Sequence, residues 1–119
     1  KTVQESVTNS IETMLAECHS PAVLRAATVS LANSKKAHLR RKASAFLCVA
    51  IERWPQAALR TTLPPIMGQM RKALFDADAT VRREGRHTFG AFIRNWPAEG
   101  GGMYHALDRA NQRTVLQEQ

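Results

Sequence analysis

The sequence predicts an all-α protein, an α-solenoid of about six helices in antiparallel pairs. Three observations predict this fold. Apolar residues recur at helical spacing along nearly all of the 119 residues. No stretch shows the sustained alternation or the Asn-Gly turn that predicts paired strands. One helical pattern also returns 42 residues later, and such a period, with two helices in each unit, is typical of stacked helical repeats.

The repeat relates His38–Pro55 to Thr80–Pro97, and each stretch predicts one amphipathic helix with basic first turns and Trp-Pro at its end. A shift of 42 residues superposes Leu39 on Val81, Arg40 on Arg82, Arg41 on Arg83, Leu47 on Phe89, Ala50 on Phe92, Ile51 on Ile93, Trp54 on Trp96 and Pro55 on Pro97. The period favours HEAT or armadillo repeats. Because Trp54 and Trp96 close the two apolar stripes, we expect both to cap the core.

Two helices are predicted before the repeat, over Thr2–Cys18 and Val23–Leu31. The first has its apolar residues on one face, and these are Val3, Val7, Ile11, Met14, Leu15 and Cys18. Ser20-Pro21 separates the two helices, and the proline suits a first helical position. Asn33-Ser34 ends the second helix, and either residue can cap the next one.

Three longer helices follow, over about Lys36–Arg53, about Gln56–Phe75 and Thr80–Pro97, each with an apolar stripe. Pro64-Pro65 must kink the middle helix or split it in two, because proline removes a backbone donor and clashes with the preceding turn. Asp78 is a suitable cap for the third helix. The helices therefore alternate as the two members of stacked pairs.

Glycines mark two further features. Gly85 replaces Ala43 of the earlier copy, which indicates a close helix contact at that point. Gly100–Gly102 is expected to be a flexible joint. The last helix is predicted to run from Met103 to about Leu116.

The composition is that of a folded protein, with 44% hydrophobic and 23% charged residues, and its length suits at most one domain. The chain begins at Lys1, without Met and inside a helical pattern, so we expect a piece of a longer protein. Cys18 and Cys48 lie in apolar helical patterns, and we expect buried free thiols in an intracellular protein. No apolar run is long enough to span a bilayer.

Positive charge is concentrated at the starts of the two repeated helices. The chain has 17 Lys and Arg against 10 Asp and Glu, a net charge of +7, and no acidic residue lies between Glu17 and Glu52. Cations at a helix start oppose the helix dipole, yet here they recur one repeat later, and stacking would bring them to one edge. They are Lys35, Lys36, Arg40, Arg41 and Lys42 in the first copy and Arg82, Arg83 and Arg86 in the second. We favour a surface for an acidic partner over a solvated face.

No set of residues predicts catalysis, a cofactor or a metal. The Cys and His residues considered as metal ligands match no known ligand spacing, and they are Cys18, His19, His38, His87 and His105. Asp76-x-Asp78 lacks the remaining ligands of a calcium loop, so capping explains it better. The stretch RRKAS resembles a kinase site, but Ser44 falls in a predicted helix. We therefore expect a binding protein and not an enzyme.

Three stretches, together with Gln112, resemble the second half of a TOG domain of the CLASP family. They are Ser34–Leu47 (SKKAHLRRKASAFL), Phe75–Phe92 (FDADATVRREGRHTFGAF) and Met103–Leu107 (MYHAL). They occur in the family's order and spacing, and the resemblance spans the chain from about Cys18. Its most specific part is the DAD stretch with the arginines that follow and the aromatic helix after them.

This resemblance implies a paddle of six HEAT repeats that binds the αβ-tubulin heterodimer, whose outer surface is acidic, through the loops along one edge. It implies that residues 1–19 form the B helix of the third repeat, 20–55 the fourth repeat, 56–99 the fifth and 100–119 the start of the sixth. The implied tubulin-binding residues are Lys35, Lys36, Arg40 and Arg41 in the fourth repeat and Arg82, Arg83 and Arg86 in the fifth. Arg83 has no firm counterpart in the family.

The family regulates microtubule dynamics: it promotes rescue, suppresses catastrophe and serves the mitotic spindle in cell division. The resemblance thus implies a protein of the cytoplasm and the microtubule cytoskeleton. Because the first repeats are absent, we expect weak tubulin binding and self-association through the truncated end. We expect no small-molecule substrate and no membrane partner. A HEAT scaffold for another acidic protein, of the kinetochore or the cilium, or for nucleic acid stays open, although few aromatic residues lie among the basic ones.

Overall fold

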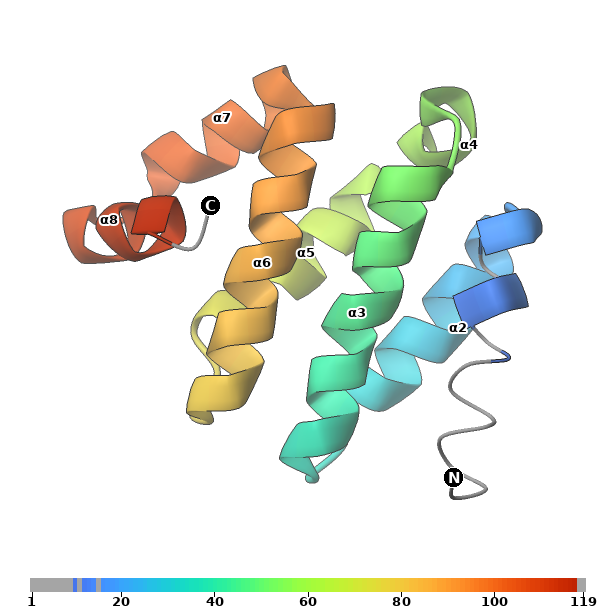
Figure 1. The fold of residues 1–119 in the computed structure, drawn as a ribbon, viewed down its shortest axis with the longest axis horizontal. Coiled ribbons are helices and arrows are strands. Elements are labelled where there is room, and N and C mark those ends of the chain that lie inside the picture. The colour runs from blue at the N-terminus through green and yellow to red at the C-terminus, as the bar shows by residue number, and fades with distance from the viewer. Residues whose placement is uncertain (1–9, 11, 15, 118–119) are drawn as a thin grey trace.

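The chain folds into antiparallel helices that stack in two layers (Figure 1). The structure is a computed structural model and describes residues 10, 12–14 and 16–117. The elements with defined bounds are α2 (Pro21–Ala32), α3 (Ala37–Arg53), α4 (Gln56–Arg60), α5 (Leu63–Leu74), α6 (Ala79–Asn95), α7 (Pro97–Ala106) and α8 (Arg109–Gln117). No strand occurs within these described ranges. The predicted all-α fold is confirmed.

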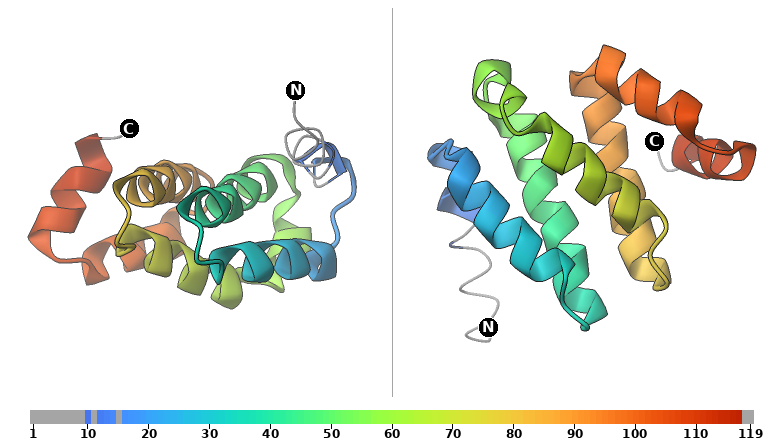
Figure 2. Two further views of the ribbon diagram at one scale, coloured as in Figure 1. Left: turned by 90° about the horizontal axis from the view of Figure 1, so that it is seen from below. Right: turned by 180° about the vertical axis from the view of Figure 1, so that it is seen from behind.

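One layer contains α2, α5 and α7, and the other contains α3 and α6 (Figure 2). α2 packs against α3, α5 against α6 and α6 against α7, and α3 and α6 lie side by side across the two repeated units. The molecule measures 40 × 32 × 21 Å along its principal axes. This stacking of helix pairs is the arrangement of an α-solenoid, as predicted.

The core is centred on the apolar stripes of α3, α5 and α6, and the other helices add residues to it. Phe46 of α3, Ile66 of α5, and Phe89 and Phe92 of α6 are each at most 2% exposed. The two repeated tryptophans, Trp54 and Trp96, are also buried, at 5% and 2% exposed. Their expected place at the ends of the apolar stripes is confirmed.

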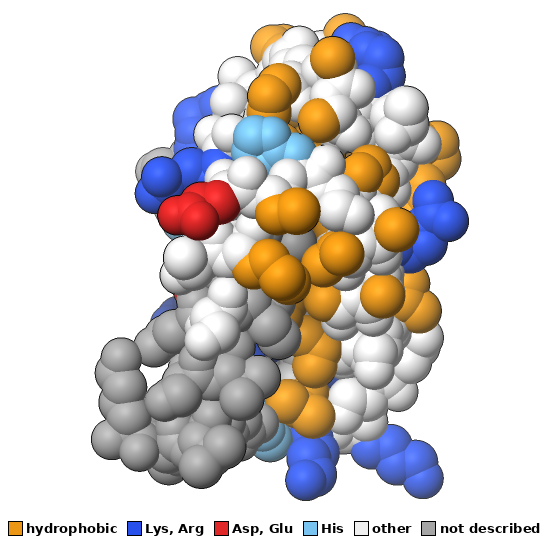
Figure 3. All heavy atoms as spheres, turned by 90° about the vertical axis from the view of Figure 1, so that its right-hand side faces the viewer, with side chains coloured by type: hydrophobic (Ala, Val, Ile, Leu, Met, Phe, Trp, Pro, Cys, Tyr) orange, Lys and Arg blue, Asp and Glu red, His pale blue; other side chains and the backbone are white. Residues whose placement is uncertain are grey.

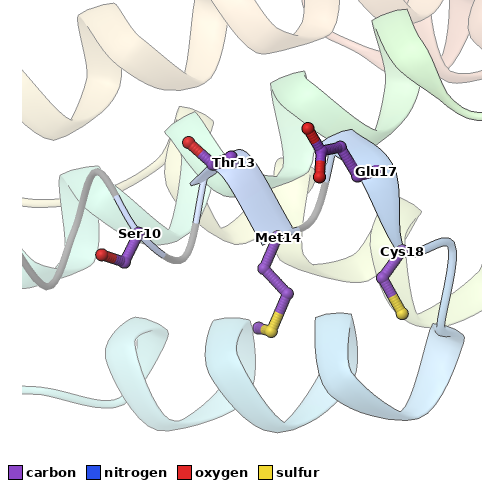
Figure 4. A pocket seen from close by; sticks show the side chains of 5 residues that line it. All are labelled: Ser10, Thr13, Met14, Glu17 and Cys18. Atoms are coloured by element: carbon purple, nitrogen blue, oxygen red, sulfur yellow. The ribbon is translucent and has the colours of Figure 1, made fainter.

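Only part of the predicted first helix is described. Residues 10, 12–14 and 16–17 are helical, whereas Val3, Val7, Ile11 and Leu15 lie outside the described residues. Figure 4 shows that the side chains of Met14 and Cys18 point toward α2. Cys18 is exposed and Cys48 is buried. The expectation of a buried thiol is therefore wrong for Cys18, because this residue follows the last helical turn and lies in the connection to α2.

The helix between the two copies is split in two, as the prolines allowed. α4 ends at Arg60, and Pro64 and Pro65 lie in the first turn of α5, where the missing backbone donors cost no helical hydrogen bond. Gly85 makes the predicted close contact, because a Cβ atom there would lie 2.9 Å from Ala73 Cβ. The short side chain therefore lets α6 approach α5.

The predicted joint at Gly100–Gly102 is wrong, because all three glycines are helical within α7. A Cβ atom on Gly100 would lie 2.8 Å from Ile93 Cα, so this glycine permits close packing of α7 on α6. The chain turns later, at Leu107 and Asp108, and the predicted last helix is thereby divided between α7 and α8. The Asp108 carboxylate accepts a hydrogen bond from the Asn111 amide at 3.4 Å and helps to start α8.

Two of the three capping expectations are confirmed. Pro21 lies in the first turn of α2, whose cap is Ser20, and Asp78 caps α6 by accepting from the amides of Thr80 and Val81. The cap of α3 is Lys36, without a side-chain hydrogen bond. Neither Asn33 nor Ser34 caps α3, because the helix begins only at Ala37. Ser34 Oγ instead accepts from the Lys36 amide at 3.1 Å.

None of the helices in the described part of the chain combines the length and the apolar character needed to cross a bilayer.

Candidate functional site at the basic edge

The connections α2–α3 and α5–α6 lie next to each other at the end where α3 and α6 begin (Figure 1). We call residues 33–42 and 75–86, which comprise these connections and the first turns of α3 and α6, the basic edge. All seven residues predicted to bind tubulin belong to it. The first turn of each of these helices contains no acidic residue, and Glu84 in the next turn of α6 is the one acidic residue in the helical part of the basic edge.

Arg40 joins the two connections. Its Nε donates to Asp76 Oδ2 at 2.8 Å and its Nη2 to Asp76 Oδ1 at 3.0 Å. Its Nη1 donates to the carbonyl oxygens of Ser34 and Lys35, both at 3.0 Å. The guanidinium therefore holds the connection before its own helix and, at the same time, the corresponding connection of the next repeat.

Arg82 makes the equivalent contacts one repeat later. Its Nη1 donates to the carbonyl oxygens of Asp76 and Ala77 at 2.8 and 3.0 Å. These carbonyls precede Arg82 by six and five residues, as those of Ser34 and Lys35 precede Arg40. The two arginines thus share one structural role. The view that cations at these helix starts oppose stability needs correction here, because both guanidinium groups bind carbonyl oxygens.

The two aspartates of the DAD stretch are ionised partners in this arrangement. The hydrogen bonds from Arg40 lower the pKa of Asp76 below its ordinary value, although burial acts in the opposite direction. The hydroxyl of Thr80, followed by the amides of Val81 and Thr80, lowers the pKa of Asp78. Asp76 also accepts from the Asp78 amide at 2.9 Å. The short connection is therefore fixed by hydrogen bonds at both of its aspartates.

Four of the predicted residues are exposed, namely Lys35, Lys36, Arg41 and Arg83. Within the described ranges, no side-chain hydrogen bond or ion pair involves any of the four. Arg86, one turn farther along α6, is half-buried. The structure therefore brings all seven residues to one edge but separates those that hold the connections from those that leave a cation open to solvent.

Two residues of this region were missed by the sequence analysis. Phe75, the first residue of the α5–α6 connection and the neighbour of Asp76 in sequence, is 59% exposed. Lys72, at the end of α5, donates to Asn33 Oδ1 at 3.0 Å. Phe75 was assigned to the predicted helix, and only the break between Leu74 and Asp78 shows that it leaves the apolar stripe.

The chain is similar to known proteins over nearly its whole length. A family model described as CLASP N terminal matches residues 1–116. The CLIP-associating protein of Drosophila melanogaster is 27% identical over 118 residues, which are 99% of this chain and 8% of that protein. The CLIP-associated protein of Arabidopsis thaliana is 26% identical over 117 residues, 98% of this chain and 8% of that protein.

Protein CLASP-2 of Caenorhabditis elegans is 30% identical over 86 residues, 72% of this chain and 8% of that protein. The chain thus spans less than a tenth of the length of these curated relatives. The family model covers both connections of the basic edge and all the helices with defined bounds except the last residue of α8. The chain therefore belongs to the CLASP N-terminal family.

Proposed function

We propose that this chain is a non-catalytic, microtubule-associated module that binds αβ-tubulin through the basic edge. The observation that carries the proposal is the set of four exposed cations, Lys35, Lys36, Arg41 and Arg83. They lie on the α2–α3 connection and in the first turns of α3 and α6, next to the two connections that Arg40 holds together. Membership of the CLASP N-terminal family supports the microtubule-associated role. An acidic protein surface would complement this edge in charge.

The seven basic residues have three different roles in this proposal. Lys35, Lys36, Arg41 and Arg83 form the direct contacts with acidic side chains of tubulin. Arg40 and Arg82 fix the two connections in the geometry that presents these cations, and Arg86 adds to the positive potential of the edge. Long-range charge of this kind speeds encounter with an acidic partner and depends on ionic strength.

The chain corresponds, in this proposal, to the second half of a TOG domain. Residues 1–19 hold the B helix of the third repeat, residues 20–55 the fourth repeat, residues 56–99 the fifth and residues 100–119 the start of the sixth. The helix pairs α2–α3 and α4/α5–α6 support this division, because their connections lie at the same end of the stack, where α3 and α6 begin (Figure 1).

The N-terminal end of the stack is apolar. Hydrophobic side chains run along the face shown in Figure 3, and a groove there is lined by Met14, Val23, Ala26, Ala27, Ser30, Leu31 and Phe46. We expect a preceding helix pair to cover this groove where one is present, and self-association to cover it otherwise. The proposed setting is the cytoplasm, on microtubules and the mitotic spindle, where the module takes part in rescue and in the suppression of catastrophe.

Replacing the four exposed cations by alanine tests the proposal. Because Arg40, Asp76 and Arg82 are left in place, the connections should keep their geometry, and the circular dichroism spectrum and melting temperature should stay close to those of the parent protein. Binding to free tubulin and co-sedimentation with microtubules should both be lost in the full-length protein. A folded variant that binds as well as the parent protein in both assays contradicts the proposal.

Binding measured over a range of salt concentrations distinguishes tubulin from nucleic acid as the partner. Nucleic-acid binding rests on the release of counterions, so its affinity falls steeply with salt. The proposal predicts that tubulin binding survives moderate salt better than binding to a random-sequence duplex. If the protein prefers the duplex at every salt concentration, the alternative function applies, a HEAT scaffold for nucleic acid. If it binds neither tubulin nor the duplex, the remaining alternative applies, a scaffold for another acidic protein.

A further inference from the structure

A cluster of metal-ligating side chains lies away from the basic edge, between α3 and α6. Cys48 and Glu52 stand one turn apart on α3, and His87 faces them from α6. The Cys48 Sγ atom, a carboxylate oxygen of Glu52 and a ring nitrogen of His87 all lie within 4.8 Å of one another. Cys48 is buried, whereas Glu52 and His87 are exposed, so an ion from solution can reach the cluster.

A fourth donor borders the same site. Glu84 lines one pocket together with Cys48, Glu52 and His87. Glu84 and His87 are three residues apart on α6, and residues at this spacing lie on one face of a helix. The donor set is therefore one sulfur, one imidazole nitrogen and two carboxylates, two residues from each of two packed helices.

We propose that Cys48, Glu52 and His87, with Glu84 as the fourth ligand, bind one zinc ion that links α3 to α6. Zinc accepts sulfur, nitrogen and oxygen ligands together in a four-coordinate site. Calcium and magnesium take oxygen ligands and would gain nothing from the thiol and the imidazole. This proposal revises the expectation that the chain binds no metal.

The distances require a small closure of the side chains. At metal–ligand bond lengths of about 2.0–2.3 Å, ligand atoms in a tetrahedron lie about 3.2–3.8 Å apart. The ligand atoms of Cys48, Glu52 and His87 lie within 4.8 Å of one another, a limit about 1 Å beyond this range. Glu84 lines the same pocket outside this group and must move farther to bind. Glu52 and His87 are exposed and can rotate about their side-chain bonds to make the adjustment, while the buried Cys48 stays in place.

The bond to Cys48 forms with the loss of one proton. In the metal-free chain the thiol donates to Glu52 Oε1 at 3.0 Å, and burial, followed by this hydrogen bond, raises the pKa of Cys48 to about 12. When zinc binds, the S–H bond breaks, the proton leaves to solvent, and the sulfur's electron pair forms the bond to zinc. Glu52, released from the S–H group, is then available as a ligand.

The charges around the cluster act in both directions. Glu52 and Glu84 attract a cation, whereas Arg53, which lines the pocket, and Arg94, whose charge acts on Cys48, oppose one. With the thiolate formed, the three anionic ligands outnumber these two arginines. We therefore expect the site to bind zinc more tightly than calcium or magnesium.

Cobalt(II) is the probe for the test, because a thiolate bound to it gives a charge-transfer band in the near ultraviolet. The chain should bind one equivalent of cobalt with this band, and zinc should displace the cobalt. Zinc should also raise the melting temperature, since it binds the folded state. Cys48→Ser should abolish the band, and Cys18→Ser, which changes the exposed cysteine, should leave it intact.

A second pair of variants keeps the test decisive if Cys48→Ser does not fold. Glu52→Gln and His87→Asn change exposed side chains, so the circular dichroism spectrum should stay unchanged, and each should weaken zinc binding at least tenfold. The proposal is overturned if the parent chain shows no thiolate–cobalt band, if the band depends on Cys18 and not on Cys48, or if both exposed variants bind zinc as tightly as the parent chain.

Discussion

Arg40 holds Asp76 through two parallel hydrogen bonds, of 2.8 Å from Nε to Oδ2 and 3.0 Å from Nη2 to Oδ1, across 36 residues of sequence. Such a paired arrangement fixes the angle as well as the distance between the two groups. The side chains are 19% and 10% exposed, so the pair is shielded from most of the solvent. It ties the α2–α3 connection to the α5–α6 connection and so determines where the exposed cations of the basic edge stand.

The first prediction concerns this pair. Asp76→Asn keeps the size of the side chain but removes its charge, and Arg40→Gln removes the fork of donors. Each should lower the melting temperature by several degrees, because each leaves a partner without its charged hydrogen bonds. Arg83→Gln, an exposed cation of the same edge, should change the melting temperature little. Equal effects of all three variants would show that the pair has no special role.

The double variant refines this prediction. If Arg40 and Asp76 act mainly on each other, combining Arg40→Gln with Asp76→Asn should cost less stability than the sum of the single changes. Additive costs would mean that Arg40 acts chiefly through the carbonyls of Ser34 and Lys35, to which it also donates. Thermal unfolding of the four proteins under one buffer condition measures the difference.

The second prediction is a dependence on acid. The pKa values of Asp76 and Asp78 are lower in the folded chain than in the unfolded chain, whose aspartates titrate near about 3.9. Their stabilising contribution is therefore complete above the unfolded value and is lost as the pH falls through the folded value. The free energy of unfolding in urea should fall below about pH 5, and less steeply in Asp76→Asn. A gap between the two proteins that stays constant down to pH 2 would contradict this account.

The third prediction compares two glycines. Gly85→Ala should destabilise the chain by about 1–3 kcal/mol, because the added Cβ would lie 2.9 Å from Ala73 Cβ and 3.2 Å from the Ala73 carbonyl carbon. Gly68→Ala, in the interior of α5, should stabilise it by about 0.5–1 kcal/mol, because no atom lies within 4 Å of the added Cβ. Urea unfolding of both variants gives the sign and size of each change. Two changes of the same sign would contradict the packing described for α5 and α6.

The fold followed from the sequence because its repeat is strong. Trp54 and Trp96 end equivalent stripes, and both are buried as expected. Pro64 and Pro65 allowed a kink or a split, and the chain takes the split. Local signals of this kind predict the structure correctly because the repeat presents each one twice, or because proline allows few backbone conformations and lacks a backbone donor.

The predictions from sequence were wrong where the role of a residue depends on a spatial neighbour that the sequence pattern does not identify. Gly100 is small because α7 packs on Ile93 of α6, and its place in a glycine run indicated flexibility instead. Cys18 belongs to an apolar pattern, but the chain has left the helix at that point. The break at Leu107 has no proline or glycine to mark it, and Asp108 alone signals the start of α8.

The candidate site was predictable as a set of residues but not as a set of roles. Charge recurrence located all seven cations at one edge. It could not show that Arg40 and Arg82 bind carbonyl oxygens whereas Lys36 and Arg83 stay exposed, because the distinction depends on where the connections place their carbonyl groups. The cluster of Cys48, Glu52 and His87 was missed because its members come from two helices.

The measurement that tests the central claim most directly is the affinity for tubulin of the full-length protein with Lys36→Glu and Arg83→Glu together, one charge reversal at the start of α3 and one near the start of α6. The matched control is Arg53→Glu with Arg71→Glu, two exposed cations outside the basic edge. At equal ionic strength, the edge variant should bind tubulin more than tenfold more weakly than the parent protein, and the control should bind within about twofold of it. Equal losses in the two variants, or full affinity in the edge variant, would contradict the claim that the basic edge binds tubulin.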